Sequence, residues 1–464
     1  MKRKLSFVLA MVILALCFTG CGSNNDVAEN GETVIYVGGC PVKEQAPELW
    51  EQFEAQRLGF MEKYPEIKVI GDEYNYSMDT YLSKAAANQL PTIYYLPFTE
   101  VDKVMEAGYV ADVTEYMEKY GYMESMRSDV LEKATRDGKV WMVPIKTYYL
   151  GMTANKEVLA QAGMLDEDGY VVWPKTFDEL GQMAGEIKAK TGIPGFVMPT
   201  MKNVGGWHFM NIAWSYGATF MEKQGEQWVA TFNSPECAEA LQFVKDLQWK
   251  YNALSDNLFI DFAEGRKMIA TNQGAFHFAV LDDNLFKPLV MQNGMDRNSI
   301  AMGKIPAGPE GQYGLLGGSM MAISSTATPA QIDACFKWLD YVGNGPKMSD
   351  EEKQVYEQSI LDRLEIGMPV LPKNCFNVWK SGEKVEAQDA ILAKYTDMDE
   401  RNLEDYYDTE GMIIKAEEPI CCQELYIILD SCIQEVISNK DADVNALLAK
   451  AANDFQVNYL DNVK

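Results

Sequence analysis

Residues 138–157 read GKVWMVPIKTYYLGMTANKE, and we interpret this stretch as the passage of the chain from one lobe into another. A short hairpin arm leads to Pro144, which has no N–H to donate to a sheet ladder. An apolar, aromatic strand is expected over 148–152, beginning with Tyr148 and Tyr149. We expect a hinge lined with a binding surface here. The alternative is that the proline ends an edge strand and both tyrosines pack in a core.

Several segments resemble, in order and spacing, those of the family 1 extracellular solute-binding proteins, the sugar-type receptors of ABC importers. The family's motifs G-K-x-Y-x-x-P, Y-N-K-x-x-F and T-W-x-E-L are similar to GKVWMVP at 138–144, TANKEVL at 153–159 and TFDEL at 176–180. The second segment departs from the family, because Thr-Ala replaces the usual tyrosine. Residues 261–276 resemble a further motif, F-x-x-G-x-x-A-M followed by a short strand and G-x-W.

The resemblance implies an α/β protein with the two-lobed periplasmic-binding-protein, or Venus flytrap, fold. Each lobe would be a mainly parallel sheet flanked by helices, and hinge crossings would join the lobes. We assign residues 32–146 and 300–345 to lobe 1, with 300–310 as the strand that returns to it. Lobe 2 would comprise residues 147–299 and 346–464, closed by two helices over 422–438 and 444–460.

The residue pattern supports this reading independently of the resemblance. A short apolar strand at 33–37 is followed by apolar residues at helical spacing over 48–64 and by a second strand at 65–70. Strand, helix and strand in this order predict a parallel sheet with a right-handed crossover. The 464 residues exceed what one hydrophobic core usually serves, so two domains are expected.

The first residues read as a targeting signal. A basic start and an apolar run too short to cross a membrane permanently make residues 1–20 a signal peptide. Phe-Thr-Gly before Cys21 resembles a bacterial lipobox, in which that cysteine is lipidated; the alternative is a plain secretory signal. Residues 21–31 would be a flexible tether. The expected location is the outer face of the bacterial cell membrane, reached through the lipid anchor alone.

Composition narrows the classes of partner. The net charge of −27 argues against nucleic acid and against a surface that binds lipid headgroups, since both are negative. It admits a cationic ligand. Seven cysteines remain beyond the signal and Cys21, an odd number with no zinc-type spacing, and we expect most to be buried apolar residues. No metal, cofactor or oligomeric partner is predicted, and the protein is expected to be a monomer.

Sugar recognition needs flat apolar faces against pyranose C–H groups and planar polar groups within reach of hydroxyls. Phe276 stands where the resemblance places the family's sugar-stacking aromatic, and Trp207 follows two glycines; the alternative for each is a core position. Gly318 and Ser319 fall in a Gly-rich turn that faces the cleft in the family. The ligand-binding residues we predict are Gly39, Asn75, Phe98, Lys146, Tyr148, Tyr149, Trp207, His208, Gln273, Phe276, His277, Gly318 and Ser319.

Nothing in the sequence supports catalysis. Zinc-protease, P-loop, nucleophile-elbow and dinucleotide-binding motifs are all absent. Asp282 and Asp283 could be read as glycosidase carboxylates, but nothing sets their separation. We therefore predict a receptor that captures an oligosaccharide and delivers it to the permease subunits of an ABC importer. The alternatives are a polyamine receptor, a ferric-iron receptor using tyrosine and histidine, and an exported carbohydrate-active enzyme.

Overall fold

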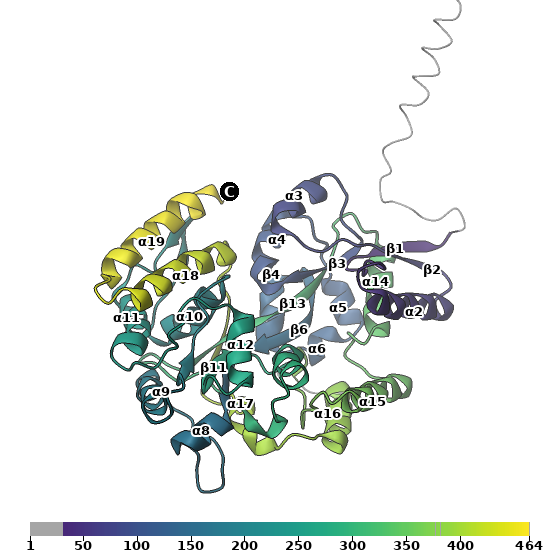
Figure 1. The fold of residues 1–464 in the computed structure, drawn as a ribbon. Helices are drawn as coiled ribbons and strands as arrows, with labels where there is room; N and C mark the ends of the chain where they lie inside the picture. The colour runs from purple at the N-terminus through teal and green to yellow at the C-terminus, as the bar shows by residue number, and fades with distance from the viewer. Residues whose placement is uncertain (1–30, 376, 381, 464) are drawn as a thin grey trace, which may run out of the picture.

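The computed structural model describes residues 31–463 except 376 and 381, and the chain forms two lobes, each built on its own sheet (Figure 1). The predicted signal peptide, Cys21 and the tether up to residue 30 lie outside the described residues. The two-lobed α/β architecture is confirmed, but the expectation of mainly parallel sheets is wrong: both sheets are mixed, and the second is mostly antiparallel.

The first lobe contains a mixed sheet in the order β14-β13-β3-β1-β2, with β6 also paired to β13. Its parallel pairs are β1 with β2, β1 with β3, and β13 with β14, whereas β13 runs antiparallel to β3 and β6. The predicted strand, helix and strand at the start of the chain are confirmed. The strands are β1 (Thr33–Val37), β2 (Ile67–Gly71), β3 (Ile93–Pro97), β6 (Met142–Tyr149), β13 (Tyr313–Ile323) and β14 (Ile413–Ala416).

Helices cover this sheet and enclose a core that includes Ile35, Leu96 and Phe336. The long helix after β13 begins with a capping box between Thr328 and Gln331, which satisfies its first free N–H groups. The helices and the small hairpin are α2 (Pro47–Lys63), α3 (Met78–Ala86), η1 (Phe98–Glu100), α4 (Val101–Ala107), α5 (Thr114–Lys119), α6 (Tyr122–Ser125), α7 (Ser128–Lys133), β4 (Thr135–Arg136), β5 (Lys139–Val140) and α14 (Pro329–Tyr341).

The second lobe contains a sheet in the order β12-β7-β11-β8. The central strand β7 runs antiparallel to β11 and β12, and β11 runs parallel to β8. These strands are buried on both faces, and a separate hairpin, β9 with β10, lies outside the sheet. The bounds are β7 (Gly151–Asn155), β8 (Phe196–Val197), β9 (Met221–Gln224), β10 (Gln227–Ala230), β11 (Phe276–Ala279) and β12 (Ile300–Gly303).

Side-chain caps fix the starts of several helices in this lobe. Thr176 accepts a hydrogen bond from Glu179 N, and Ser234 accepts one from Cys237 N, so α9 and α11 each begin at a side-chain N-cap. The helices are α8 (Lys156–Ala162), α9 (Phe177–Thr191), α10 (Val204–Ser215), α11 (Pro235–Trp249), α12 (Phe262–Ala270), α13 (Asp283–Phe286), η2 (Lys287–Gln292), η3 (Arg297–Ser299), α18 (Cys422–Ser438), α19 (Val444–Asn458) and η5 (Leu460–Asn462).

The two closing helices return to the second lobe, as predicted. Leu429 of α18 and Phe455 of α19 are fully buried in the core that β7 and α10 also form. Figure 1 shows α18 and α19 (yellow) over the lobe that α8 to α11 (teal) build from the middle of the chain.

The crossing from β6 to β7 passes through Leu150, whose N–H donates to Leu315 O of β13. Within β6 the register shifts, so that Lys146 pairs with Ser319 but Pro144 pairs with Met320. Ile145 is the extra residue of this bulge. A bulge is a common place for proline, since proline cannot supply a ladder N–H.

Two predicted lobe boundaries need correction. Residues 300–303, expected to return to the first lobe, form β12 and pair with β7 of the second sheet. The chain crosses only afterwards, before β13. The physical reason is that β12 supplies the edge that β7 needs to complete its ladder.

The segment 346–420 belongs to both lobes rather than to the second. Val378 and Trp379 pack in the first core, Tyr406 packs beside the second sheet, and β14 joins the first sheet. The helices of this segment are α15 (Asp350–Glu365), α16 (Glu383–Tyr395), η4 (Glu400–Asn402) and α17 (Glu404–Tyr407).

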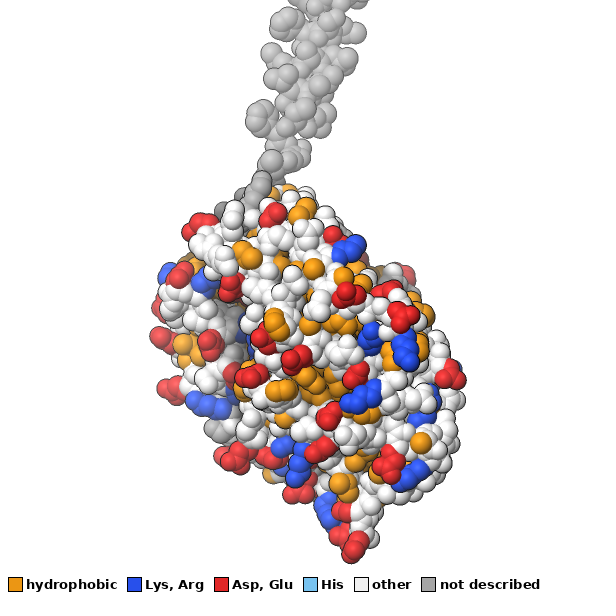
Figure 2. All heavy atoms as spheres, turned by 90° about the vertical axis from the view of Figure 1, so that its left-hand side faces the viewer, with side chains coloured by type: hydrophobic (Ala, Val, Ile, Leu, Met, Phe, Trp, Pro, Cys, Tyr) orange, Lys and Arg blue, Asp and Glu red, His pale blue; other side chains and the backbone are white. Residues whose placement is uncertain are grey.

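Acidic and basic side chains are interspersed over the face shown in Figure 2, with no field of one sign. None of the helices formed by the described residues combines the length and apolar character that a membrane crossing requires.

Candidate functional site

A hollow of about 260 Å³ lies where the first sheet meets the crossing segments. We call it the acidic hollow, because it is lined by two glutamates and no basic residue. Its wall consists of Tyr76, Pro97, Thr99, Glu100, Tyr148, Gly318, Glu417 and Gln423. Several of these residues follow strand ends of the first sheet, where the loops of parallel strands normally build ligand sites.

The two carboxylates of the acidic hollow are almost fully buried. Glu100 is 6% exposed and accepts a hydrogen bond of 2.6 Å from the Tyr76 hydroxyl. Glu417 is 8% exposed and accepts one of 2.6 Å from Tyr426. Burial raises the pKa of Glu417 to about 7; the Tyr426 hydrogen bond and Lys133 oppose this rise, and the charge of Glu100 adds to it.

The hollow continues to the second lobe through Gln423, whose Oε1 accepts a hydrogen bond from Asn203 Nδ2 at 3.1 Å. Asn203 precedes α10, and the first N–H groups of that helix are satisfied by a distant residue. Asp430 of α18 accepts from Asn203 N at 2.8 Å and from Gly206 N at 2.7 Å. The start of α10 is thereby tied to α18, the helix that lines the hollow through Gln423.

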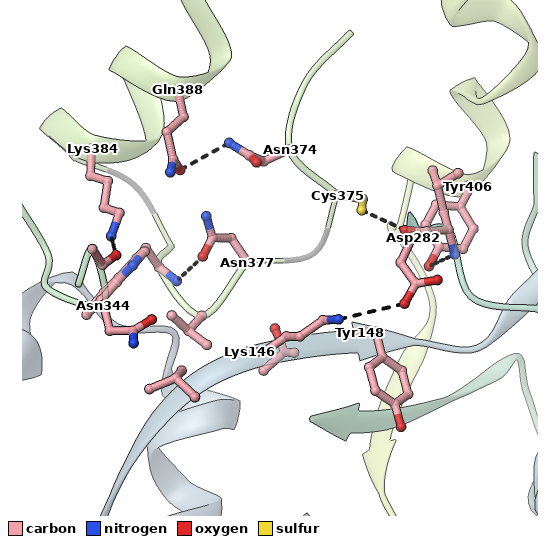
Figure 3. Close-up of a pocket in the computed structure, with 16 residues that line it drawn as sticks. Lys146, Tyr148, Asp282, Asn344, Asn374, Cys375, Asn377, Lys384, Gln388 and Tyr406 are labelled. Atoms are coloured by element: carbon pink, nitrogen blue, oxygen red, sulfur yellow. Dashed lines mark hydrogen bonds and ion pairs between the residues drawn. The ribbon is translucent and has the colours of Figure 1, made fainter. Parts of the chain in front are cut away.

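A second hollow, of about 240 Å³, shares Tyr148 with the first (Figure 3). We call it the amide hollow, because Asn344, Asn374, Asn377 and Gln388 line it. Carboxamides both donate and accept hydrogen bonds, as sugar hydroxyls require of their partners. The remaining wall consists of Ile145, Lys146, Thr147, Leu281, Asp282, Gly343, Cys375, Val378, Trp379, Lys384 and Tyr406.

The amide hollow also contains charged groups from both lobes. Lys146 of the crossing strand lies 3.7 Å from Asp282, which follows β11 in the second lobe. Lys384 donates to Gly343 O and, at 2.7 Å, to Gly345 O at the end of the first lobe. Burial lowers the pKa of Lys384 to about 8. The wall therefore combines polar and charged groups with apolar side chains, and Trp379 supplies an aromatic face.

Tyr148 stands at the junction of the two hollows. Its strand partner is Gly317, and a Cβ placed on that glycine would lie 2.3 Å from the tyrosine ring. Because Gly317 has no side chain, the ring of Tyr148 can occupy this space. The next residue along, Tyr149, is buried and stacks on Tyr406 at a ring distance of 4.2 Å, and the two exchange hydrogen bonds between their hydroxyls and main-chain carbonyls.

Of the predicted ligand-binding residues, Lys146, Tyr148 and Gly318 line the hollows. Two more lie directly behind them. Phe98 is buried against Gly318, and Ser319 donates a hydrogen bond of 2.9 Å to the hydroxyl of Tyr95.

Phe276 requires correction as a stacking platform. It is fully buried, with Trp173 as a ring neighbour, and it lies at the start of β11. The strand runs toward the crossing at its other end, where Ala279 pairs with Gly151. The residues that reach the amide hollow are therefore those after the strand, Leu281 and Asp282.

Three other predicted residues lie inside the second lobe. His208 and His277 are fully buried with rings 5.6 Å apart, and Trp207 is half-buried beside His208. Burial lowers the pKa of His277 to about 4 and that of His208 well below its ordinary value, so both are neutral at pH 7. They support the fold of this lobe rather than either hollow.

The remaining predictions are not brought into either hollow. Gln273 is exposed in the turn before β11, and Asn75 is exposed with its side chain on the carbonyl of Glu73. Gly39 lies in the turn after β1 with φ of +80°. Within the described residues, no group of three or more His, Cys, Asp or Glu could hold a metal ion.

Sequence reasoning missed the two glutamates and the four carboxamides. Asp282 carried a usable signal, because a polar pair directly after a buried strand is typical of a cleft edge. Glu417 and three of the carboxamides come from the segment between 346 and 420, which has no recognisable motif, and the fourth, Asn344, lies just before it. They reach the junction through long-range packing that local patterns do not encode.

The sequence profile of the bacterial extracellular solute-binding proteins matches residues 48–350, and the chain belongs to that family. Solved structures of this class share its fold at low identity. The cyclic alpha-maltosyl-1,6-maltose binding protein of Arthrobacter globiformis is 19% identical, with a TM-score of 0.63 over 91% of this chain and 98% of its own. The Listeria monocytogenes protein Lmo0181, solved with cycloalternan, is 16% identical, with a TM-score of 0.62 over 92% and 98%.

A third similar structure was solved with a ligand of different chemistry. UgpB of Mycobacterium tuberculosis, in complex with glycerophosphocholine, is 14% identical, with a TM-score of 0.65 over 92% of this chain and 98% of its own. At these identities the likeness shows a shared two-lobed fold.

Proposed function

We propose that this protein captures an oligosaccharide at the junction of its lobes and delivers it to the permease subunits of a bacterial ABC importer. The observation that carries the proposal is the amide hollow. Four carboxamides, the Trp379 ring and the Lys146–Asp282 pair surround a space open to both lobes, in a member of a solute-binding family. Planar polar groups beside aromatic faces suit pyranose rings.

The similar structures support the carbohydrate as ligand. One of the three is described as a cyclic alpha-maltosyl-1,6-maltose binding protein, and another was solved in complex with cycloalternan. A space of about 240 Å³ beside a second one of about 260 Å³ has room for more than one sugar ring. We therefore place the ligand along both hollows, with Tyr148 between neighbouring rings.

We further propose that Cys21 is lipidated, that the chain is anchored to the outer face of the cell membrane and that it acts as a monomer without catalysis. Mass spectrometry of the purified protein tests the anchor, which adds acyl chains to an N-terminal Cys21. Release of reducing ends from oligosaccharides would contradict the absence of catalysis.

A thermal-shift screen tests the ligand class. The purified protein is heated with oligosaccharides, polyamines and ferric citrate in parallel. A ligand that binds the native state stabilises it by about 2.7 kcal/mol at a hundredfold excess over its dissociation constant. We expect a shift with one class of oligosaccharide. A shift with ferric citrate alone would contradict the proposal, although the described residues do not bring the tyrosines and histidines of an iron site together.

A further inference from the structure

We infer that the acidic hollow binds an ammonium group, so that the transported glycan carries a free amino group. This inference rests on the proposed function and names a finer ligand class for the same site. The hollow places two carboxylates, Glu100 and Glu417, in one wall together with two tyrosines, Tyr76 and Tyr148.

The carboxylates have no cationic partner inside the hollow. None of the residues lining it is basic. The nearby lysines are paired elsewhere: Lys133 lies 2.6 Å from Asp102, and Lys415 lies 3.5 Å from Glu418. The charge of Glu100 disfavours ionisation of Glu417, and a cation between the two carboxylates would offset that effect.

The hydrogen bonds already made leave acceptor capacity for a ligand. Glu100 receives the hydroxyl of Tyr76 on Oε2, and Glu417 receives the hydroxyl of Tyr426 on Oε1. A carboxylate has about four acceptor positions, and an ammonium group has three donors. Each glutamate can therefore accept from the ligand without losing its tyrosine.

The tyrosine rings favour the same chemistry. An ammonium group beside an aromatic face gains a cation–π interaction, which grows in a desolvated site. A neutral hydroxyl at this position would gain neither the charge attraction nor the ring contact. Tyr148 also lines the amide hollow, so one ligand can place its amine on the acidic side and its hydroxyls among the carboxamides.

The test compares matched disaccharides that differ at one substituent. Glucosamine, N-acetylglucosamine and glucose dimers, each in several linkages, are titrated by calorimetry into the purified protein, with spermidine as the non-sugar amine. We expect the amino form to bind about 10- to 100-fold more tightly than its acetylated and hydroxyl counterparts, the loss typical of one charge-assisted hydrogen bond. Equal or tighter binding of the neutral forms overturns the inference while leaving the carbohydrate proposal intact.

The spermidine titration distinguishes an amino group on a glycan from a polyamine as the ligand of the hollow. Binding of spermidine with no glycan bound would support the ammonium site and overturn the carbohydrate proposal. Equal binding of glycans with and without an amino group would support the carbohydrate proposal and overturn the ammonium site. If no amine of either kind binds, the inference fails.

Two variants locate the effect. Glu100→Gln and Glu417→Gln keep the side-chain shape, and each should abolish the preference for the amino dimer over its acetylated and hydroxyl counterparts. The matched control is Glu418→Gln. Glu418 is adjacent to Glu417 in the chain and is also buried. Its carboxylate accepts a hydrogen bond from Trp214 Nε1 at 3.2 Å, and it does not line the hollow. A preference that survives both test variants, or that is lost in the control alone, contradicts the assignment.

Discussion

Glu417 should make the stability of the protein depend on pH in a recognisable way. Its pKa is raised from 4.5 to about 7 in the folded chain, so the folded state holds a proton that the unfolded state releases between these values. The free energy of unfolding therefore falls as pH rises from 4.5 to 7, and is unaffected by this group above both values.

The substitution Glu417→Gln removes this dependence. Relative to the wild type, the variant should gain about 2 to 3 kcal/mol in unfolding free energy between pH 5 and pH 8. Urea denaturation at the two pH values measures the difference. Glu226→Gln, at an exposed turn, is the control and should follow the wild type. A variant curve parallel to the wild type would show that Glu417 is not held protonated.

Gly317 and Tyr148 form a coupled pair. Gly317→Ala would place a Cβ 2.3 Å from the Tyr148 ring, which must then move out of the space between the hollows. We expect a cost of about 1 to 3 kcal/mol in stability and weaker ligand binding. In a Tyr148→Ala background the same change should cost less than about 0.5 kcal/mol, because the obstruction is gone. Additive effects in the double-mutant cycle would contradict the coupling.

At the scale of single residues, the sequence predicted Tyr148 and Lys146 because they sit in the crossing strand, whose proline and aromatic pattern is local. Gly318 was predicted from the resemblance as part of a turn, but it lies within strand β13. Sequence reasoning misplaced Phe276 by about one strand length. The resemblance places a ligand-stacking aromatic at Phe276, whereas this residue is the first of β11 and is fully buried. A strand that is buried on both faces lacks the alternation of apolar and polar residues, so the sequence does not show which of its side chains reach a cleft.

The helix α10 depends on a cap from outside its own segment. Asn203 precedes the helix with φ of +72° and makes no capping bond with its side chain. Asp430 supplies both missing acceptors across a separation of more than two hundred residues. This carboxylate joins α10 to α18, one of the closing helices of the second lobe.

Replacing Asp430 tests this link. Asp430→Ala leaves two buried N–H groups without partners and should destabilise the protein by about 2 to 4 kcal/mol in urea denaturation. Asp430→Asn keeps one acceptor and should cost about half as much. If both variants denature like the wild type, the cap contributes nothing to stability.

At the scale of elements, the strands and helices up to residue 97 and the N-caps at Thr176 and Ser234 were predictable, because each has a local signature. The place of β12 was not. A four-residue apolar strand fits either sheet, and its pairing with β7 is decided by which open edge lies nearer in the folded chain.

The whole molecule consists of two sheets joined by several crossings, with the ligand-sized spaces where the crossings gather. Residues 346–420 contribute to both lobes and to both hollows, so this segment shapes the site as well as the fold. Lobe closure about the crossing strands would enclose a ligand held there. Lobe closure would also bring the residues after β11 and the start of α18 against the ligand.

The most direct test of this account is a crystal structure of the protein with the oligosaccharide that gives the largest thermal shift. We predict electron density for the sugar beside Tyr148, with at least one contact to a carboxamide of the amide hollow and with an amino group between Glu100 and Glu417. A sugar bound away from the lobe junction, or without contact to Tyr148, would contradict the assignment of this site.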